Sequence, residues 1–245
     1  MYYLKAYSAG SIIATSWRIY FREWRTIFLI LILPMTAAHV LSFLIKHTGT
    51  LGTVVGSLAT LFAQAFIIFP TVVAVSEVCL DIRPTVARSY RRAFARPGRL
   101  FGAYFLTVAI VFGGFILLLI PGILFSVWYM LVGPVVVLEA LTVRATLKRS
   151  RELGRGYYWR NFGTLFGGSI LVLIPTMLIA GIAGASIGYL TDAGPWRFGV
   201  AELVGNLMGL IAAPPLAIMP VLLYYDMRAR KEGYAAAQLA EELRF

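Results

Sequence analysis

The chain has 245 residues, of which 60% are hydrophobic and only 13% charged, and its mean hydropathy is +0.81. A soluble domain is about 45–50% apolar with about 25% charged residues, so this composition excludes a soluble globular protein. The 22 basic and 11 acidic residues leave a net charge of +11. In a soluble protein that excess would favour nucleic acid as a partner, but here the charges are confined to short blocks between long apolar runs.

Five segments contain no Asp, Glu, Lys or Arg. They cover residues 26–45, 47–76, 100–138, 161–191 and 203–225, with lengths of 20, 30, 39, 31 and 23 residues. A helix crosses the hydrocarbon core with about 20 apolar residues. Transmembrane β-strands alternate apolar and polar residues over about 10 residues, and these runs do not alternate. The sequence therefore predicts an all-α, polytopic membrane protein.

The basic residues predict how the chain is oriented. Four precede the first apolar run, six follow the second, six lie in 144–160 and four follow the last run, which leaves only Lys46 and Arg197 elsewhere. Cytoplasmic loops carry the excess of Lys and Arg, so all four blocks are expected in the cytoplasm. The 39-residue run must then cross the membrane twice, and we predict its turn at Pro121-Gly122.

This topology has six spans and places both termini in the cytoplasm. The predicted spans are 26–45, 54–76, 101–120, 123–141, 163–190 and 200–225. The first run follows a basic stretch and has no small-residue cleavage site, so a removed signal peptide is not expected. We predict a single integral membrane domain over 1–245, with a short cytoplasmic tail at 226–245.

The basic blocks read as amphipathic helices, because their cations recur at helical spacing opposite aromatic and aliphatic residues. The three cationic stripes comprise Arg18, Arg22 and Arg25; Arg88, Arg92, Arg96 and Arg99; and Arg144, Lys148, Arg151 and Arg155. Such helices lie in the headgroup plane, where each basic residue is attracted to an anionic leaflet by about 1 kcal/mol. The residues of the three stripes other than Arg99 are candidates for binding anionic lipid.

The blocks and spans also suggest three copies of one unit, at approximately 8–80, 81–141 and 142–228. Each unit has a basic helix, an outward span and a returning span with a proline and a carboxylate at its cytoplasmic end. The carboxylates are Glu77, Glu139 and Asp226. We expect them to be structural, with Asp226 pairing with Arg230 one helical turn later. The alternatives are a chance likeness among apolar helices, and carboxylates that bind a metal or substrate.

Three strongly polar side chains lie well inside the predicted spans, namely His39, Gln64 and Asn206. Hydrogen bonding between helices is the expected role, and proton coupling by His39 is the alternative. Prolines and glycines within the spans fit close helix packing or the broken helices of transporters. A transporter would be expected to bury ionisable groups at mid-depth, whereas the carboxylates here lie near the ends of spans.

No catalytic group is evident in the sequence. The two histidines, His39 and His47, and the single cysteine, Cys79, do not supply a three-ligand zinc site by themselves. The H-E-x-x-H, G-x-S-x-G and P-loop motifs do not occur. We therefore expect no enzyme activity, no catalytic residue, no metal and no cofactor.

Segments along the chain resemble a known family. Residues 144–162, RATLKRSRELGRGYYWRNF, and 223–234, LYYDMRARKEGY, are similar to bacterial membrane proteins of the family called the glycerophosphoryl diester phosphodiesterase membrane domain. The opening SWRIY at 16–20, with Trp24-Arg25, is similar in style. Ala235 departs from the pattern, because an acidic residue often follows the Gly-aromatic pair. If a partner of the tail binds that carboxylate, its binding is in doubt here.

The resemblance implies a module of the bacterial inner membrane. The phosphodiesterase domain itself would need about 200 or more further residues in a barrel, and about 20 follow the last predicted span. The leading hypothesis is a non-enzymatic module that contacts anionic lipid or acts as a scaffold for another membrane protein, with no nucleic-acid partner. A transporter or lipid-translocating protein built from the three hairpins is second, and an enzyme acting on phospholipid headgroups is third.

Overall fold

The computed structural model describes residues 7–45, 49–139, 141–190, 197–233 and 238. Every regular element in this part of the chain is a helix, so the predicted all-α class is confirmed. The helices, in chain order, are α1 (Ala9–Arg22), α2 (Trp24–Ile45), α3 (Thr50–Cys79), α4 (Val86–Ala93), α5 (Pro97–Leu117), α6 (Leu119–Tyr129), α7 (Val132–Leu138), α8 (Val143–Gly154), α9 (Tyr158–Leu190) and α10 (Arg197–Glu232).

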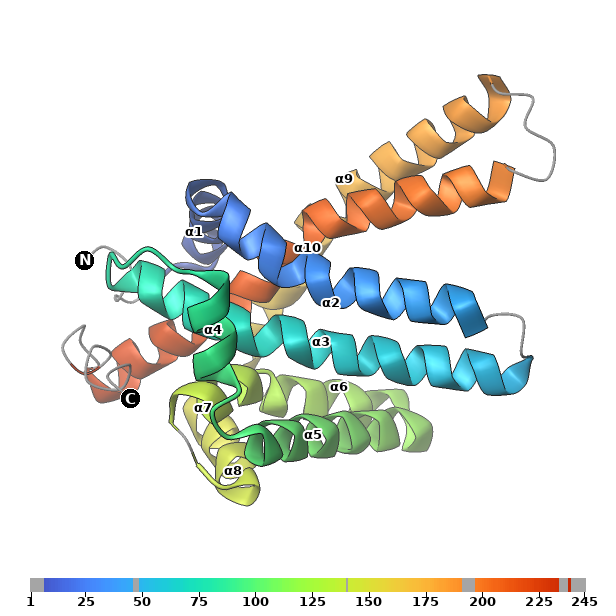
Figure 1. The fold of residues 1–245 in the computed structure, drawn as a ribbon. Coiled ribbons are helices and arrows are strands. Elements are labelled where there is room, and N and C mark those ends of the chain that lie inside the picture. Colours follow the sequence, from blue (N-terminus) through green and yellow to red (C-terminus); the bar gives the residue numbers. More distant parts are fainter. Residues whose placement is uncertain (1–6, 46–48, 140, 191–196, 234–237, 239–245) are drawn as a thin grey trace.

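The long helices form three hairpins that extend toward the same side of the molecule, with α9–α10 splayed away from the other two (Figure 1). Helix α2 packs against α3, α5 against α6, and α9 against α10. A short helix precedes each hairpin in the chain: α1, α4 and α8, respectively. These short helices lie at the end of the bundle opposite the hairpin tips, together with both ends of the described chain. The threefold repeat itself stays a prediction.

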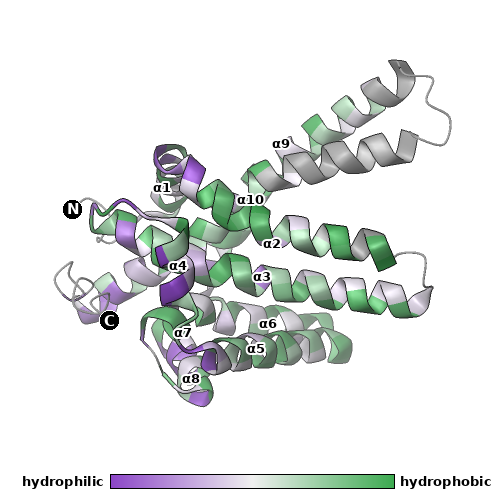
Figure 2. Ribbon diagram, in the orientation of Figure 1, coloured by the Kyte–Doolittle hydropathy of each residue, from purple (hydrophilic) through white to green (hydrophobic). Residues whose placement is uncertain are grey.

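Four helical segments are long and apolar enough to cross a membrane: Thr50–Cys79, Pro97–Leu117, Leu119–Leu138 and Tyr158–Ser186. This is the pattern of a multi-pass integral membrane protein. Helix α2 contributes a shorter apolar segment among the described residues, Trp24–Ala38. Hydrophilic residues gather at the end that carries α1, α4 and α8, and the hairpins are mostly hydrophobic (Figure 2). The count of six spans stays a prediction.

The turn of the second hairpin lies earlier than Pro121-Gly122, so that prediction is wrong by a few residues. Leu118 is extended, with φ −166° and ψ 155°, and α6 starts at the next residue. Pro121 therefore belongs to the first turn of α6. The N–H groups of a first turn have no acceptor within the helix, so the lack of an N–H on proline costs no hydrogen bond there. The first hydrogen bond of α6 runs from Gly122 N to Leu118 O.

The returning half of this hairpin is divided into two helices. The sequence predicts one span over 123–141, but α6 ends at Tyr129 and α7 starts at Val132. Pro134 is the cause, since its ring clashes with the carbonyl four residues earlier, that of Met130, and it has no N–H to donate. The break turns α7 away from the direction of α6 (Figure 1).

The returning helices α3, α7 and α10 meet in the middle of the bundle. Near the polar end α3 and α10 are enclosed on all sides, because every residue of 69–79 in α3 and of 221–227 in α10 is buried. A helix buried all round is a core helix. By contrast, α9 exposes large apolar side chains such as Leu171, Met177 and Ile182, as expected of a surface that faces lipid.

Candidate functional site

Three of the carboxylates at the polar end of the bundle lie one at the end of each returning helix. Glu77 lies in the last turn of α3, Glu139 follows α7 directly, and Asp226 lies in the last part of α10. The side chains of Glu77 and Asp226 are 0% exposed and that of Glu139 is 12% exposed. A buried carboxylate needs partners for its charge, and each of these three has an arginine partner.

Glu77 is paired with α4. Its Oε1 lies 3.0 Å from Arg92 Nη1 and 2.9 Å from Arg88 Nε. The contact with Arg88 Nε is an ion pair without the alignment of a hydrogen bond, and Oε2 has no hydrogen-bond partner among the described residues. Helix α4 is also fixed by Tyr90, whose hydroxyl donates to the Ile30 carbonyl at 2.9 Å. Burial raises the pKa of Tyr90 to about 12.

Glu139 links three helices. Its Oε2 lies 2.8 Å from Arg149 Nε of α8, and its Oε1 accepts a hydrogen bond from the Tyr224 hydroxyl of α10 at 3.0 Å. Arg149 Nη2 reaches Glu232 at 2.6 Å. Burial of Arg149 disfavours its charge, but its contacts with Glu139 and Glu232 outweigh that effect, and the pKa of the guanidinium is raised above its ordinary value. Arg149 is therefore a structural cation.

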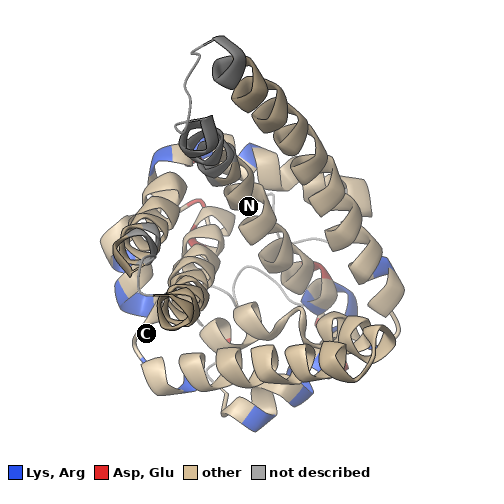
Figure 3. Ribbon diagram, turned by 90° about the vertical axis from the view of Figure 1, so that its right-hand side faces the viewer, with Lys and Arg blue, Asp and Glu red and all other residues tan. Residues whose placement is uncertain are grey.

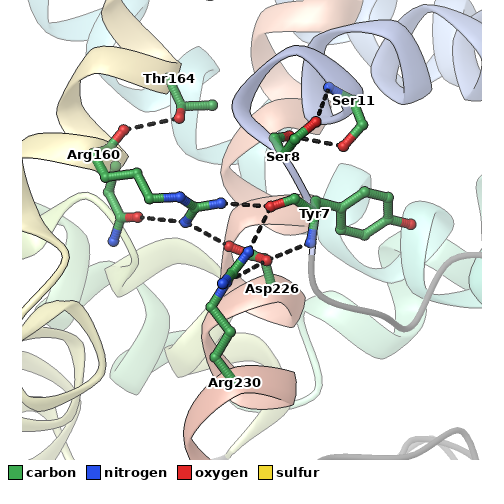
Figure 4. A network of polar contacts seen from close by, with 8 residues as sticks. Tyr7, Ser8, Ser11, Arg160, Thr164, Asp226 and Arg230 are labelled. Carbon is green, nitrogen blue, oxygen red and sulfur yellow. Dashed lines mark hydrogen bonds and ion pairs between the residues drawn. The ribbon is translucent and has the colours of Figure 1, made fainter.

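Asp226 is the centre of the third cluster (Figure 4). Its Oδ1 accepts from Arg230 Nε at 2.9 Å, which confirms the predicted pair, and Oδ2 lies 2.7 Å from Arg160 Nη1. The backbone N–H of Tyr7 donates to Oδ1 at 2.6 Å. Both guanidinium groups also donate to the Tyr7 carbonyl, at 2.6 and 2.7 Å. The cluster thus joins the N-terminal segment, α9 and α10.

The three carboxylates do not form a metal site in the described part of the chain, where no group of three or more His, Cys, Asp or Glu residues is placed to hold an ion. Each carboxylate lies in its own arginine cluster. The partners Arg149, Arg160 and Tyr224 were not foreseen in the sequence. For Arg149 a signal existed, because it falls opposite Arg144, Lys148 and Arg151 on α8, among buried residues such as Leu153.

Most of the candidate lipid-binding cations point outward. The exposed candidates are Arg18, Arg22, Arg25, Arg96, Arg144, Lys148, Arg151 and Arg155. Arg88 and Arg92 are instead half-buried against Glu77. In the view along the bundle, basic residues lie around the periphery and acidic residues further in (Figure 3). Cations at this end are thus divided between an inner set that pairs with the carboxylates of the returning helices and an outer set that is exposed.

The first and second cationic stripes each extend over two helices, so the prediction of one helix for each stripe is wrong. In the first stripe, α1 ends at Arg22 and Arg25 belongs to α2. The second stripe is also divided. Helix α4 ends at Ala93, Arg96 caps the start of α5, and Arg99 belongs to α5. The reason is Pro97, which occupies the first position of α5. The residue before a proline is pushed out of the helical region, and Arg96 has φ −137° and ψ 67°.

The polar residues of the predicted spans are only partly described. The side chains of His39 and Asn206 lie outside the described part of the structure. Gln64 of α3 lines a cavity of about 420 Å³ between the hairpins. The other lining residues are mainly apolar, among them Pro134 and Pro220 of the returning helices, and none of the described lining residues is Asp, Glu, His, Lys or Arg.

Comparison of the chain with protein-family models, curated proteins and solved structures finds no match. The similarity to the glycerophosphoryl diester phosphodiesterase membrane domain therefore stays a prediction from the sequence.

Proposed function

We propose that this protein is a non-enzymatic module of the bacterial inner membrane that contacts the anionic cytoplasmic leaflet through its basic end. In this proposal α2 and α10 complete a set of six spans, and both termini lie in the cytoplasm. The hairpins anchor the chain in the bilayer, and α1, α4 and α8 lie at headgroup depth. A membrane-protein partner bound to the lipid-facing surface is compatible with this role.

The main support for the proposal is the division of the cations into a set paired with carboxylates and a set that is exposed. Arg88, Arg92, Arg149, Arg160 and Arg230 are occupied by buried carboxylates and hold the helices together. The outer set is exposed at the same end of the bundle, where the apolar surface of the hairpins stops. Exposed cations directly beside a hydrocarbon-facing surface are the arrangement that favours anionic lipid headgroups, at about 1 kcal/mol per residue.

The cavity near Gln64 gives the second candidate its support. A transporter or lipid-translocating protein needs a space between its repeats, and the cavity of about 420 Å³ lies between the hairpins. The described part of its lining is mainly apolar and has no ionic group, which fits a lipid chain better than an ion or polar solute. An enzyme acting on headgroups is less well supported, since Glu77, Glu139 and Asp226 are each engaged by arginines.

The proposal is tested by the lipids that the protein retains. The full chain is reconstituted in equal amounts of phosphatidylglycerol and phosphatidylcholine, extracted in mild detergent at low salt, and the co-purifying lipids are quantified. We expect enrichment of phosphatidylglycerol, and a smaller enrichment for a variant with Arg144→Gln, Lys148→Gln and Arg155→Gln. Retention of both lipids in the proportion supplied would contradict the proposal.

A further inference from the structure

A small recess opens beside the second hairpin, between the end of α4, the start of α5 and α7. Its volume is about 140 Å³. Three arginines line it, Arg92, Arg96 and Arg99, and apolar residues including Leu100 and Val136 form the rest of its wall. Leu100 and Val136 are 3% and 4% exposed. The recess thus has guanidinium groups on one side and buried hydrocarbon on the other.

The electrostatics of this region favour an anion. The sequence from Ile82 to Leu138 contains no acidic residue. In this segment α4 carries Arg88, Arg91 and Arg92, Arg96 caps α5, and Arg99 lies in the first turn of α5. Glu77 contacts two members of this cluster, Arg88 and Arg92. Like charges held close together repel. An anion bound among Arg92, Arg96 and Arg99 would reduce that repulsion.

The residue types point to phosphate as the anionic group. A guanidinium presents a planar fork of donors that fits phosphate oxygens in a bidentate manner. The recess also adjoins the first residues of α5, a 21-residue helix. The N-terminus of a helix carries a partial positive charge, and this charge favours phosphate. Here these features occur together with three arginine side chains in one recess.

The depth of the recess identifies the source of the phosphate. Arg99 is the last charged residue before the apolar run of 100–138, so the recess lies at the border between the basic end and the hydrocarbon-facing surface. Phospholipid headgroups occupy that level. A lipid phosphate placed there would have its glycerol and acyl chains beside the apolar surface of α5, whereas free phosphate would gain nothing from that surface.

We propose that this recess binds the phosphate of one anionic phospholipid, with Arg96 and Arg99 as its principal ligands and Arg92 as a shared ligand of Glu77. The inference rests on the proposed function, because it places one specific lipid within the general contact with the leaflet. The other exposed cations attract anionic lipid without holding a particular molecule.

The test counts bound lipids on the full chain by native mass spectrometry in detergent, during titration with dioleoyl phosphatidylglycerol. Wild-type protein is expected to bind one lipid saturably. The double variant Arg96→Gln/Arg99→Gln should bind it about 5- to 25-fold more weakly, since each arginine near the surface is worth about 1 kcal/mol, or about fivefold. Arg92 is left unchanged because it also pairs with Glu77.

Two further variants separate the recess from general charge and from misfolding. Arg144→Gln/Arg155→Gln removes two exposed cations from another helix and should retain the saturable lipid. Ala95→Phe keeps the charge and places a ring at an exposed position that lines the recess, and it should weaken binding. An equal loss of lipid affinity in the two double arginine variants, or unchanged affinity in Ala95→Phe, would contradict the assignment of the lipid to the recess. Neither result would contradict the proposed function.

Two competition arms complete the test. Phosphatidylcholine should not occupy the saturable site, and equal binding of both lipids by wild-type protein would overturn the proposed function together with the recess. Inorganic phosphate at the same concentration as the lipid should leave lipid binding unchanged. Full displacement of the lipid by inorganic phosphate under these conditions would assign the recess to free phosphate and contradict the lipid proposal.

Discussion

Asp226 Oδ2 lies 2.7 Å from Arg160 Nη1, although 66 residues separate the two positions in the chain. The contact closes the α9–α10 hairpin at the polar end, the end opposite its tip (Figure 1). Because both residues also contact Tyr7, the same cluster fixes the segment that leads into α1. The position of α1 thus depends on a buried carboxylate.

Removal of the charge of Asp226 should destabilise the protein. Asp226→Asn leaves Arg160 and Arg230 without their anionic partner. Both side chains remain about one quarter exposed, so we expect a loss of about 1–3 kcal/mol, the usual cost of an unsatisfied buried hydrogen-bonding group. Thermal unfolding in detergent measures it. The control Glu152→Gln removes an exposed carboxylate that lies 3.8 Å from Lys148 and should leave Tm unchanged; equal Tm values for both variants would refute the structural role.

Two arginines on α8 should differ sharply in their effect on stability. Arg149→Gln removes the arginine partner of Glu139 and leaves its hydrogen bond with the Tyr224 hydroxyl. We expect a lower Tm. Arg144→Gln changes an exposed residue of the same helix and should alter stability by less than about 0.5 kcal/mol. Parallel melts of the two purified variants make the comparison. A larger loss for Arg144→Gln would show that the inner and outer sets are assigned the wrong way round.

A pair of adjacent glycines provides a matched test of packing in the second hairpin. A Cβ added at Gly114 would lie 2.7 Å from the Phe125 ring and 3.0 Å from the backbone of Gly122, whereas one added at Gly113 meets nothing within 4 Å. Gly114→Ala should therefore cost about 1–3 kcal/mol by overpacking. Gly113→Ala should be neutral or stabilising by up to about 1 kcal/mol. If the two variants melt at the same temperature, α5 and α6 do not pack as closely as the structure has them.

The predicted topology can be measured by cysteine labelling in intact cells. Single cysteines at Thr50, Leu118 and Ser186, near the tips of the three hairpins, should react with a membrane-impermeant maleimide from outside. A cysteine at Arg155, which is exposed at the basic end, should react only after the cells are opened. The native Cys79 is 1% exposed and should give little background. Labelling of position 155 in intact cells would reverse the orientation.

The positions of the long helices could be predicted from the sequence because hydrophobic length and helix-breaking residues determine them. The predicted span 163–190 lies within α9, and the predicted span 26–45 nearly coincides with α2. The exact breaks could not be predicted, because a proline acts at a distance of several residues. Pro134 interrupts the helix near Met130, and Pro121 is accommodated after a turn at Leu118.

The carboxylate clusters were only partly predictable for a related reason. Asp226 and Arg230 are neighbours on one helix, so their spacing alone indicates contact. The contacts of Asp226 with Arg160, and of Glu139 with Tyr224, join different helices. Helical spacing within one block says nothing about such pairs. Arg88 and Arg92 show the same limit, since their spacing fits a lipid-facing stripe and their actual partner is Glu77.

The selectivity of the protein for anionic lipid in a bilayer tests the central claim most directly. Trp24 and Trp159 are exposed on helices next to the basic end, so brominated lipids beside them should quench tryptophan fluorescence. At low salt, brominated phosphatidylglycerol should quench more strongly than brominated phosphatidylcholine, and added salt should reduce the difference because it screens exposed charges. Equal quenching by the two lipids at low salt would contradict the account.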